Sequence, residues 1–254
     1  MKASVCIDAV FEGLPKPEAM ARVRACGIDA IEFWSWWDQD LDEITNAAEE
    51  HSLSIASVCT KFISLVDVKC RESYLRGLEE SIVAAKRLRC PTLISQVGDL
   101  LPGVDRQVQH DSLVEGLREA ARLLEGSGVT LVFEPLNDTV DHEGYYLVRS
   151  DEAFEIVREV NSPSVKVVFD LYHQQISEGD VIRNATENVE AIGHFHAAGN
   201  PGRNELTRGE LNYAEIFRAI AEAGYRQFIG LEYWPIESPE TGLRVAKQML
   251  DAII

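Results

Sequence analysis

Positive charge is scarce in this 254-residue sequence. Lysine and arginine contribute 24 residues against 42 aspartate and glutamate residues, so the formal net charge is -18 at pH 7. A surface of this kind repels phosphate backbones and anionic lipid. We therefore expect neither nucleic acid nor a membrane surface as a partner, and the excess of acid is most simply a source of solubility.

Cysteine is also sparse. The five cysteines are an odd number and form no Cys-x-x-Cys pair, which argues against a disulfide framework or a thiolate zinc site. No apolar run approaches the roughly 20 residues that span a bilayer. Asp8 interrupts the apolar run near the N-terminus, which makes that segment a poor signal peptide. We expect a cytoplasmic protein.

The chain lacks any recognisable linker. It has no Pro/Ser/Gly-rich run, no low-complexity block and no shift in composition, and 46% of its residues are hydrophobic. A chain of this length is able to bury one large core. The sequence therefore predicts a single domain over residues 1–254.

Apolar runs alternate along the chain with longer segments of helical periodicity, as in βα units around a parallel sheet. Amphipathic helices are expected at residues 72–89, 111–128 and 212–225, the last two with glycine at or next to their C-terminal ends. Eight strands are expected, at residues 3–10, 30–36, 54–59, 92–98, 130–137, 166–172, 191–198 and 228–235.

Eight units of about 32 residues each match a (β/α)8 TIM barrel. An open doubly wound sheet shows the same alternation. However, no expected strand is followed by a GxGxxG or GxxxxGK[ST] loop. The closed barrel is therefore favoured.

Four of the later strands carry an ionisable residue near the C-terminal end, a feature that packing does not predict. The residues are Glu134, Asp170, His196 and Glu232, separated by 36, 26 and 36 residues, roughly one βα unit each. In a barrel they converge at the C-terminal mouth, where this fold places active sites. Each alone has an ordinary explanation, because a carboxylate at a strand end can cap the next helix or pair with an arginine.

Together, the four residues predict a metal site. Three carboxylates in one mouth repel one another unless a cation lies between them. One histidine among oxygen donors suits Mn²⁺ or Mg²⁺, with Co²⁺ also possible, better than structural zinc. No organic cofactor is expected.

Such a site suits proton transfer next to a carbonyl group. Two glutamates, Glu134 and Glu232, would flank the substrate carbons. One would remove the α-proton, the metal would stabilise the resulting enediolate, and another group would reprotonate the neighbouring carbon. The expected outcome is aldose–ketose isomerisation or epimerisation of a small molecule.

The segment HFHAAGNPGRNEL contains two histidines on one face of an expected strand. His196 lies nearer the mouth. His194 lies about 7 Å deeper, at roughly 3.3 Å per residue. We expect it to be buried among polar partners and to support the site from below.

The second half of the sequence resembles the xylose-isomerase-like TIM barrels, and within them the hydroxypyruvate isomerases and ketose 3-epimerases. The matching segments are FEPLN, FDLYHQQISEGD, IGHFHAAGNPGRNELTRGELNY and GLEYWP. By motif, the resemblance implies that Glu134, Asp170, His196 and Glu232 are the metal ligands and that Glu134 and Glu232 are the acid–base pair.

The resemblance further implies that His173 and Arg203 contact the substrate and that the protein is a dimer or tetramer. Two departures favour the epimerase side. Hydroxypyruvate isomerases often carry glutamine where His196 stands, and the loop NDTVDHEGYYL replaces a shorter one. Asp141 and His142 of that loop either line the pocket or cap the loop.

Weaker candidates follow the earlier strands. Trp36, on the same strand face as Trp34, and Lys61 are candidate substrate-binding residues, although ordinary packing and an exposed lysine explain them equally well. Gln96 lies at the same mouth, and the role of Glu32 stays open.

Two other functions are possible on the same barrel. An endonuclease IV-type nuclease needs many histidines and a surface that tolerates DNA, against six histidines and a charge of -18 here. A non-catalytic sugar-binding barrel would not need two flanking glutamates.

Overall fold

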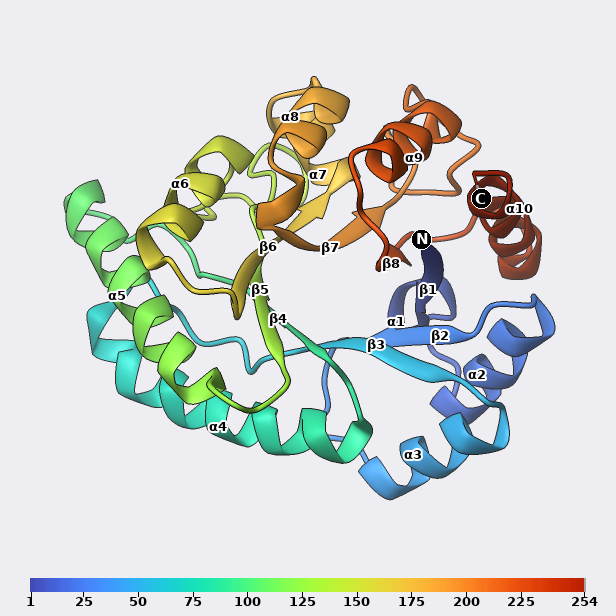
Figure 1. The fold of residues 1–254 in the computed structure, drawn as a ribbon, viewed down its shortest axis with the longest axis horizontal. Coiled ribbons are helices and arrows are strands. Elements are labelled where there is room, and N and C mark those ends of the chain that lie inside the picture. Colours follow the sequence, from blue (N-terminus) through green and yellow to red (C-terminus); the bar gives the residue numbers. More distant parts are fainter. Residues whose placement is uncertain (254) are drawn as a thin grey trace.

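The computed structural model describes residues 1–253, which form a closed barrel of eight parallel strands. The strands pair in chain order, and β1 closes the ring by pairing with β8. The strands are β1 (Lys2–Cys6), β2 (Ala30–Phe33), β3 (Ser54–Cys59), β4 (Thr92–Ser95), β5 (Thr130–Phe133), β6 (Val165–Asp170), β7 (Ile192–Ala197) and β8 (Phe228–Leu231). The expected (β/α)8 TIM barrel is confirmed (Figure 1).

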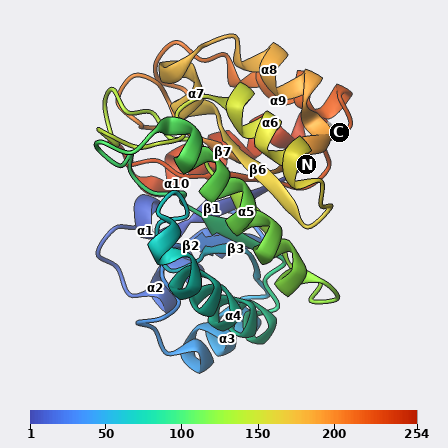
Figure 2. The ribbon, with the colours of Figure 1, turned by 90° about the vertical axis from the view of Figure 1, so that its left-hand side faces the viewer.

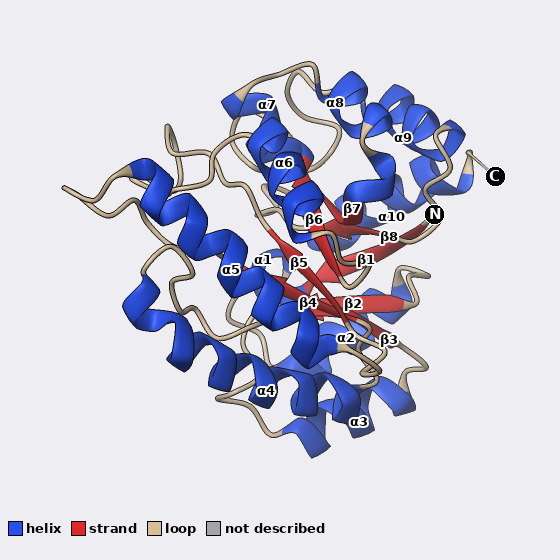
Figure 3. Cartoon of the chain, turned by 60° about the vertical axis from the view of Figure 1, so that its left-hand side comes forward, coloured by secondary structure: helices blue, strands red, loops and turns tan. Residues whose placement is uncertain are grey.

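Helices form a layer outside the barrel (Figure 3). In Figure 2, α4 and α5 lie side by side along the outer surface. The α-helices are α1 (Ile7–Val10), α2 (Lys16–Ala25), α3 (Leu41–Glu50), α4 (Arg71–Leu88), α5 (Arg106–Leu124), α6 (Ser150–Val160), α7 (Leu171–Ser177), α8 (Val181–Glu187), α9 (Tyr213–Glu222) and α10 (Pro239–Asp251), with 3-10 turns η1 (Val68–Cys70) and η2 (Val189–Ala191). None of the helices within residues 1–253 combines the length and apolar character that a bilayer crossing requires.

Seven of the eight expected strands continue beyond the observed C-terminal end of the strand. Only β3 ends where the sequence pattern ends. Apolar residues that extend the pattern are buried outside the strands: Ile7 starts the short helix α1, and Val97 and Leu136 lie in the loops that follow β4 and β5. Burial alone therefore did not distinguish a strand from a packed loop.

A glycine was expected at the C-terminal end of two helices, α5 and α9, and it is found there only in α9. Gly224 follows α9 with a φ of +102° and donates its N–H to the carbonyl of Ala221, as a C-terminal glycine does. Helix α5 instead ends at Leu124, before Gly126. Arg89 ends α4 in the left-handed conformation without glycine.

The interior of the barrel is divided between two kinds of side chain. A small apolar cluster of Cys59, Ile94, Val132 and Val168 comes from β3 to β6, with Trp34 against it. On the other side, Ser4, Glu32, Ser57 and His194 are buried on β1, β2, β3 and β7. The large apolar core forms a separate cluster that includes residues of both strands and helices. The buried polar half therefore needs internal hydrogen bonds, because water does not reach it.

The packing of Phe169 on β6 against Phe154 on α6 should contribute to the stability of the fold. The Phe169 ring is fully buried, stacked on Phe154 at 6.2 Å between centroids and tilted against Phe195 at 5.9 Å. Phe169→Ala is expected to lower the free energy of unfolding by about 3–5 kcal/mol, because it removes this contact and leaves a cavity. Urea denaturation measures the effect.

Val108→Ala is the control, because Val108 on α5 is 54% exposed. It is expected to change the free energy of unfolding by no more than about 0.5 kcal/mol. Equal effects of the two substitutions would contradict the packing assigned to Phe169.

Candidate active site

A cavity of about 260 Å³ opens at the C-terminal ends of the strands. Its size suits a compound of a few carbons. It is lined by Cys6, Glu32, Phe33, Trp34, Ser57, Cys59, Phe62, Ile94, Gln96, Glu134, Leu136, His142, His173, His196, Arg203, Glu232 and Trp234. Most of its wall is apolar, and the ionisable groups gather in one part of it, which is the usual character of a small-molecule site.

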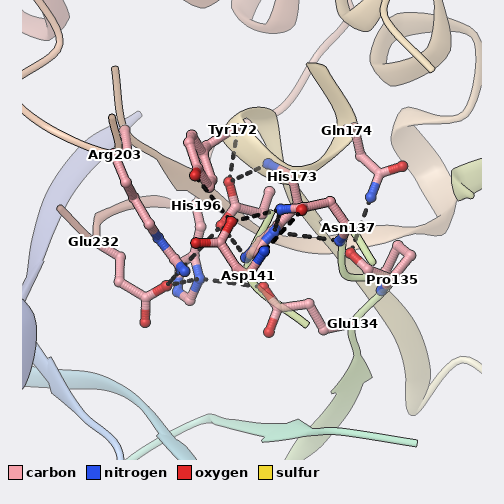
Figure 4. A network of polar contacts seen from close by, with 12 residues as sticks. Glu134, Pro135, Asn137, Asp141, Tyr172, His173, Gln174, His196, Arg203 and Glu232 are labelled. Atoms are coloured by element: carbon pink, nitrogen blue, oxygen red, sulfur yellow. Dashed lines mark hydrogen bonds and ion pairs between the residues drawn. The ribbon is translucent and has the colours of Figure 1, made fainter. Parts of the chain in front are cut away.

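Three of the four expected metal ligands lie close together, and two of them, Glu134 and His196, line the cavity. One atom each of Glu134, Asp170 and His196 lies within 4.8 Å of the other two. The Nδ1 atom of His196 is 3.5 Å from Oε1 of Glu134 and 3.6 Å from Oε2 of Glu232 (Figure 4). The fourth residue, Glu232, therefore lies beside the same imidazole, although it is outside the three-residue group.

The atoms that face one another in this group lack hydrogen-bond partners. Among the described residues, Oε1 of Glu134, Oδ2 of Asp170 and Nδ1 of His196 are buried and unpaired. A buried polar group without a partner costs about 1–3 kcal/mol. Once His196 gives up its Nδ1 proton, these three atoms around one point are a donor set that fits a divalent cation.

Asp170 has two separate roles. It is the last residue of β6, and its Oδ1 accepts the N–H groups of Tyr172 and His173, which caps α7. Its Oδ2 faces the cluster. Helix capping and the proposed ligand role are therefore compatible in one side chain, because each uses a different oxygen.

Charge and burial shift the pKa values of the group in different directions. Burial raises the pKa of Asp170 to about 7, against the opposing charges of Arg203 and His196. Burial also acts to raise the pKa of Glu232, but the positive charges of His196 and Arg203 outweigh it, and this pKa is lowered. Burial acts to lower the pKa of His196, and Glu232, Glu134 and Glu32 together raise it well above the usual value. The cluster thus favours positive charge at its centre.

Arg203 supplies the nearest fixed positive charge. Its Nη2 donates to Oε2 of Glu232 at 2.5 Å and lies 3.7 Å from Oδ2 of Asp170. The guanidinium is stacked between the rings of Tyr172 and Trp234, at 5.2 and 5.1 Å from their centroids. These contacts hold Arg203 against the carboxylates at the cavity wall.

His173 is held as a neutral hydrogen-bond donor. Its Nδ1 is 2.6 Å from Nδ2 of Asn137, whose N–H donates to it. The remaining nitrogen, Nε2, therefore carries the proton. It is buried, unpaired within the described residues and 3.6 Å from Oδ2 of Asp170. Burial holds the pKa of His173 well below its usual value, so the ring is neutral.

The loop after β5 holds these residues from one side. Asp141 accepts hydrogen bonds from Nδ2 of Asn137 and from the hydroxyl of Tyr172. His142 lines the cavity with its ring 5.2 Å from that of His173. Asp141 thus supports the loop, and His142 faces the cavity. Asn137 belongs to the segment FEPLN, which the sequence analysis singled out, but no sequence pattern indicates its contact with His173.

Two residues expected to bind the substrate, Trp36 and Lys61, lie outside the cavity lining. Lys61 forms an ion pair with Glu80 on α4, and its ammonium lies 5.7 Å from the centroid of the Trp36 ring. Strand β2 ends at Phe33, so strand alternation does not carry on to Trp36. Their role in substrate binding stays a prediction.

Other aromatic residues form the wall in their place. Trp34, Phe62 and Trp234 line the cavity, and Nε1 of Trp34 donates to Oε1 of Glu232 at 2.8 Å. Gln96 lines the cavity as expected from the end of β4. The sequence pattern placed Trp34 at this mouth but did not identify its hydrogen bond to a glutamate.

Below the cluster, Glu32 lies between the two histidines of β7. Its Oε1 is 3.0 Å from Nε2 of His194, and its Oε2 is 3.0 Å from Nε2 of His196. His194 is buried in polar surroundings and does not belong to the Glu134, Asp170 and His196 group. The position expected for His194 is confirmed.

Known proteins of similar sequence and fold agree with this architecture. Hydroxypyruvate isomerase of Escherichia coli is 31% identical over 231 residues, which are 88% of this chain and 89% of that protein. 2-Oxo-tetronate isomerase of Cupriavidus necator is 39% identical over 158 residues, which are 62% of this chain and 60% of that protein.

Among solved structures, one described as AP endonuclease, family 2, from Brucella melitensis is 31% identical. It covers 96% of this chain and 97% of its own, with a TM-score of 0.89. A family model described as a xylose isomerase-like TIM barrel matches residues 20–253. The chain therefore belongs to the xylose isomerase-like TIM barrel family.

Proposed function

We propose that the protein is a divalent-metal-dependent isomerase that interconverts an aldose-type and a ketose-type form of a small hydroxy-carbonyl compound, as a hydroxypyruvate isomerase does. The observation that carries the proposal is the unpaired cluster of Glu134 Oε1, Asp170 Oδ2 and His196 Nδ1, with Glu232 beside it. Relatives named hydroxypyruvate isomerase and 2-oxo-tetronate isomerase support the reaction class.

The donor set favours Mn²⁺ or Mg²⁺, with Co²⁺ as an alternative, and no organic cofactor is required. Carboxylate oxygens dominate the set, and its single nitrogen comes from His196. Glu134, Asp170, His196 and Glu232 would hold the ion. A bound divalent cation supplies Lewis-acid polarisation of a substrate carbonyl oxygen.

The two glutamates move the proton. One takes the α-proton as its C–H bond breaks, and a proton returns to the neighbouring carbon from the other, while the hydroxyl proton passes to the former carbonyl oxygen. Glu232 is suited to begin as the base, because its lowered pKa keeps it ionised. The hydrogen bonds from Trp34 and Arg203 fix its orientation.

His173 and Arg203 bind and orient the substrate. The fixed Nε2–H of His173 is available to donate to a substrate oxygen. Arg203 supports negative charge that develops on the oxygens, at a site where burial strengthens electrostatic interactions. The apolar wall of Trp34, Phe62 and Trp234 excludes water from the carbon side of the substrate.

Ketose 3-epimerisation is the second candidate. It uses the same pair of glutamates and differs in that the proton is removed from and returned to one carbon. The presence of histidine at position 196, typical of the ketose epimerases that the sequence resembles, favours it. The position of solvent-derived deuterium distinguishes the two reactions.

Nuclease activity is disfavoured, although a similar structure carries an AP endonuclease description. The net charge of -18 opposes the approach of DNA phosphates. A binding protein without activity is disfavoured because two glutamates adjoin the same imidazole.

Solvent exchange tests the acid–base pair. With Mn²⁺ present, the wild-type protein is expected to incorporate deuterium from D₂O into hydroxypyruvate, an aldose or a ketose, read by NMR. Glu134→Gln and Glu232→Gln are each expected to slow exchange by about 10²–10⁴-fold, because an amide cannot take up the proton. Circular dichroism checks that both variants are folded.

Glu143→Gln is the matched control, because Glu143 is exposed in the loop after β5 and should leave exchange unchanged. Failure of all compounds to exchange under every metal would contradict the isomerase proposal. Full activity of both Gln variants would contradict the acid–base roles.

Asp170→Asn tests the metal site without measuring turnover. Asparagine keeps the cap of α7 but removes a negative ligand. Mn²⁺ binding, measured by calorimetry, is expected to weaken by more than the about 10–100-fold typical of lost outer-shell contacts. The control is Asp105→Asn, since Asp105 caps α5 on the surface in the same way. Unchanged Mn²⁺ affinity in Asp170→Asn would exclude this residue as a ligand.

A further inference from the structure

Glu32 is a fully enclosed carboxylate that the proposed reaction does not use. It lies on β2 and is 2% exposed. Four side chains surround its two oxygens: Oε1 meets the hydroxyl of Ser4 and Nε2 of His194, and Oε2 meets the hydroxyl of Ser57 and Nε2 of His196. They come from β1, β3 and β7, so this one side chain connects strands on both sides of β2.

These contacts determine which nitrogen of His196 carries the proton. An ionised carboxylate only accepts hydrogen bonds, so each of its four partners must donate. His196 therefore has its proton on Nε2, 3.0 Å from Oε2 of Glu32. In the neutral ring the lone pair is then on Nδ1, which is the atom that faces Glu134 and Glu232.

We propose that Glu32 is the positioning residue of the metal site: it holds His196 in the tautomer and orientation that present Nδ1 to the ion. The inference rests on the proposed function, since it assigns Glu32 a role toward that ion. A carboxylate behind a ligating histidine fixes the ring and strengthens it as a ligand.

A direct ligand role for Glu32 fits the geometry less well. Glu32, His194 and His196 lie close enough together to be considered as a separate metal group. However, both nitrogens are already 3.0 Å from its oxygens, which is a hydrogen-bond distance, and each oxygen has a second donor from a serine. No lone-pair nitrogen faces Glu32, so a cation placed there would have to displace the protons of both rings.

Gly230 on the adjacent strand β8 leaves the space that this contact requires. A Cβ atom at position 230 would lie 2.5 Å from Cδ2 of His196 and 2.6 Å from Oε1 of Glu32. Real Cβ atoms do not approach other atoms so closely. The sequence therefore has a glycine where any side chain would push the carboxylate and the imidazole apart.

His194 orients the carboxylate from the opposite end. Its ring is 5.1 Å from the ring of His196 at an angle of 85°, and both donate to Glu32 through Nε2. Together with Ser4, His194 holds Oε1 and so leaves Oε2 turned toward His196 and Ser57. The two histidines of β7 thus act on the site through one carboxylate.

Glu32→Gln tests the proposal by metal binding. Glutamine has one oxygen and one NH₂ group, so it cannot accept from both histidines, and an NH₂ group facing His196 favours the wrong tautomer. The dissociation constant of Mn²⁺, measured by calorimetry without substrate, is expected to rise by about 10–100-fold. Glu178→Gln is the matched control, because Glu178 is also enclosed and hydrogen-bonded, to Ser150, but outside the cavity lining. Its Mn²⁺ affinity should equal that of the wild type.

Nitrogen-15 NMR of histidine-labelled wild-type protein with bound Mg²⁺ provides a second measurement that requires no variant of Glu32. The expected spectrum has the His196 proton on Nε2 and no proton on Nδ1, the nitrogen that faces the ion. A proton on Nδ1 would overturn the proposal, even if Glu32→Gln does not fold. Equal Mn²⁺ affinity in folded Glu32→Gln and wild type would overturn it as well. Failure of the wild type to bind metal would instead overturn the proposed function, and this inference with it.

Discussion

The burial of four carboxylates in one barrel is the constraint on which the rest of the site depends. Glu32, Glu134, Asp170 and Glu232 are each at most 6% exposed. Removing a carboxylate from water is costly unless hydrogen bonds or opposite charges replace the solvent. The lower carboxylate, Glu32, is satisfied by four donors, whereas the upper three share Arg203 and His196. The upper group is therefore where a further positive charge is stabilised.

Three site residues, Asp170, His196 and His173, each use one polar atom in a hydrogen bond to the scaffold and leave a second polar atom free. Oδ1 of Asp170 caps α7, and Oδ2 faces the cluster. Nε2 of His196 is bonded to Glu32, and Nδ1 faces the cluster. His173 repeats this arrangement with Nδ1 on Asn137 and Nε2 free. The scaffold holds each group by one end, so the free ends need little reorganisation when a ligand binds.

The alternation of eight βα units predicts the barrel, and the spacing of polar residues at strand ends predicts that Glu134, Asp170, His196 and Glu232 meet at one mouth. Each strand end is a local feature, and the repeat of βα units carries it into three dimensions. The sequence pattern placed both Trp34 and Trp36 at the mouth, but only Trp34 lines the cavity, together with Trp234, because loop conformation after a strand does not follow strand alternation.

The role of Glu32 could likewise not be predicted from the sequence. Glu32 and His196 are 164 residues apart, and their contact depends on how the ring of strands closes. The space left by Gly230 has no sequence signature of its own either, since a glycine in a strand has several explanations. Pairing across the barrel is a property of the closed structure and not of any segment.

The central claim is that one divalent cation binds where the three unpaired atoms meet. Anomalous X-ray diffraction from crystals soaked in Mn²⁺ tests it most directly. The account predicts one strong peak about 2.0–2.5 Å from Oε1 of Glu134, Oδ2 of Asp170 and Nδ1 of His196. The absence of a peak at this position under saturating Mn²⁺, or a peak that places the ion among other side chains, would contradict it.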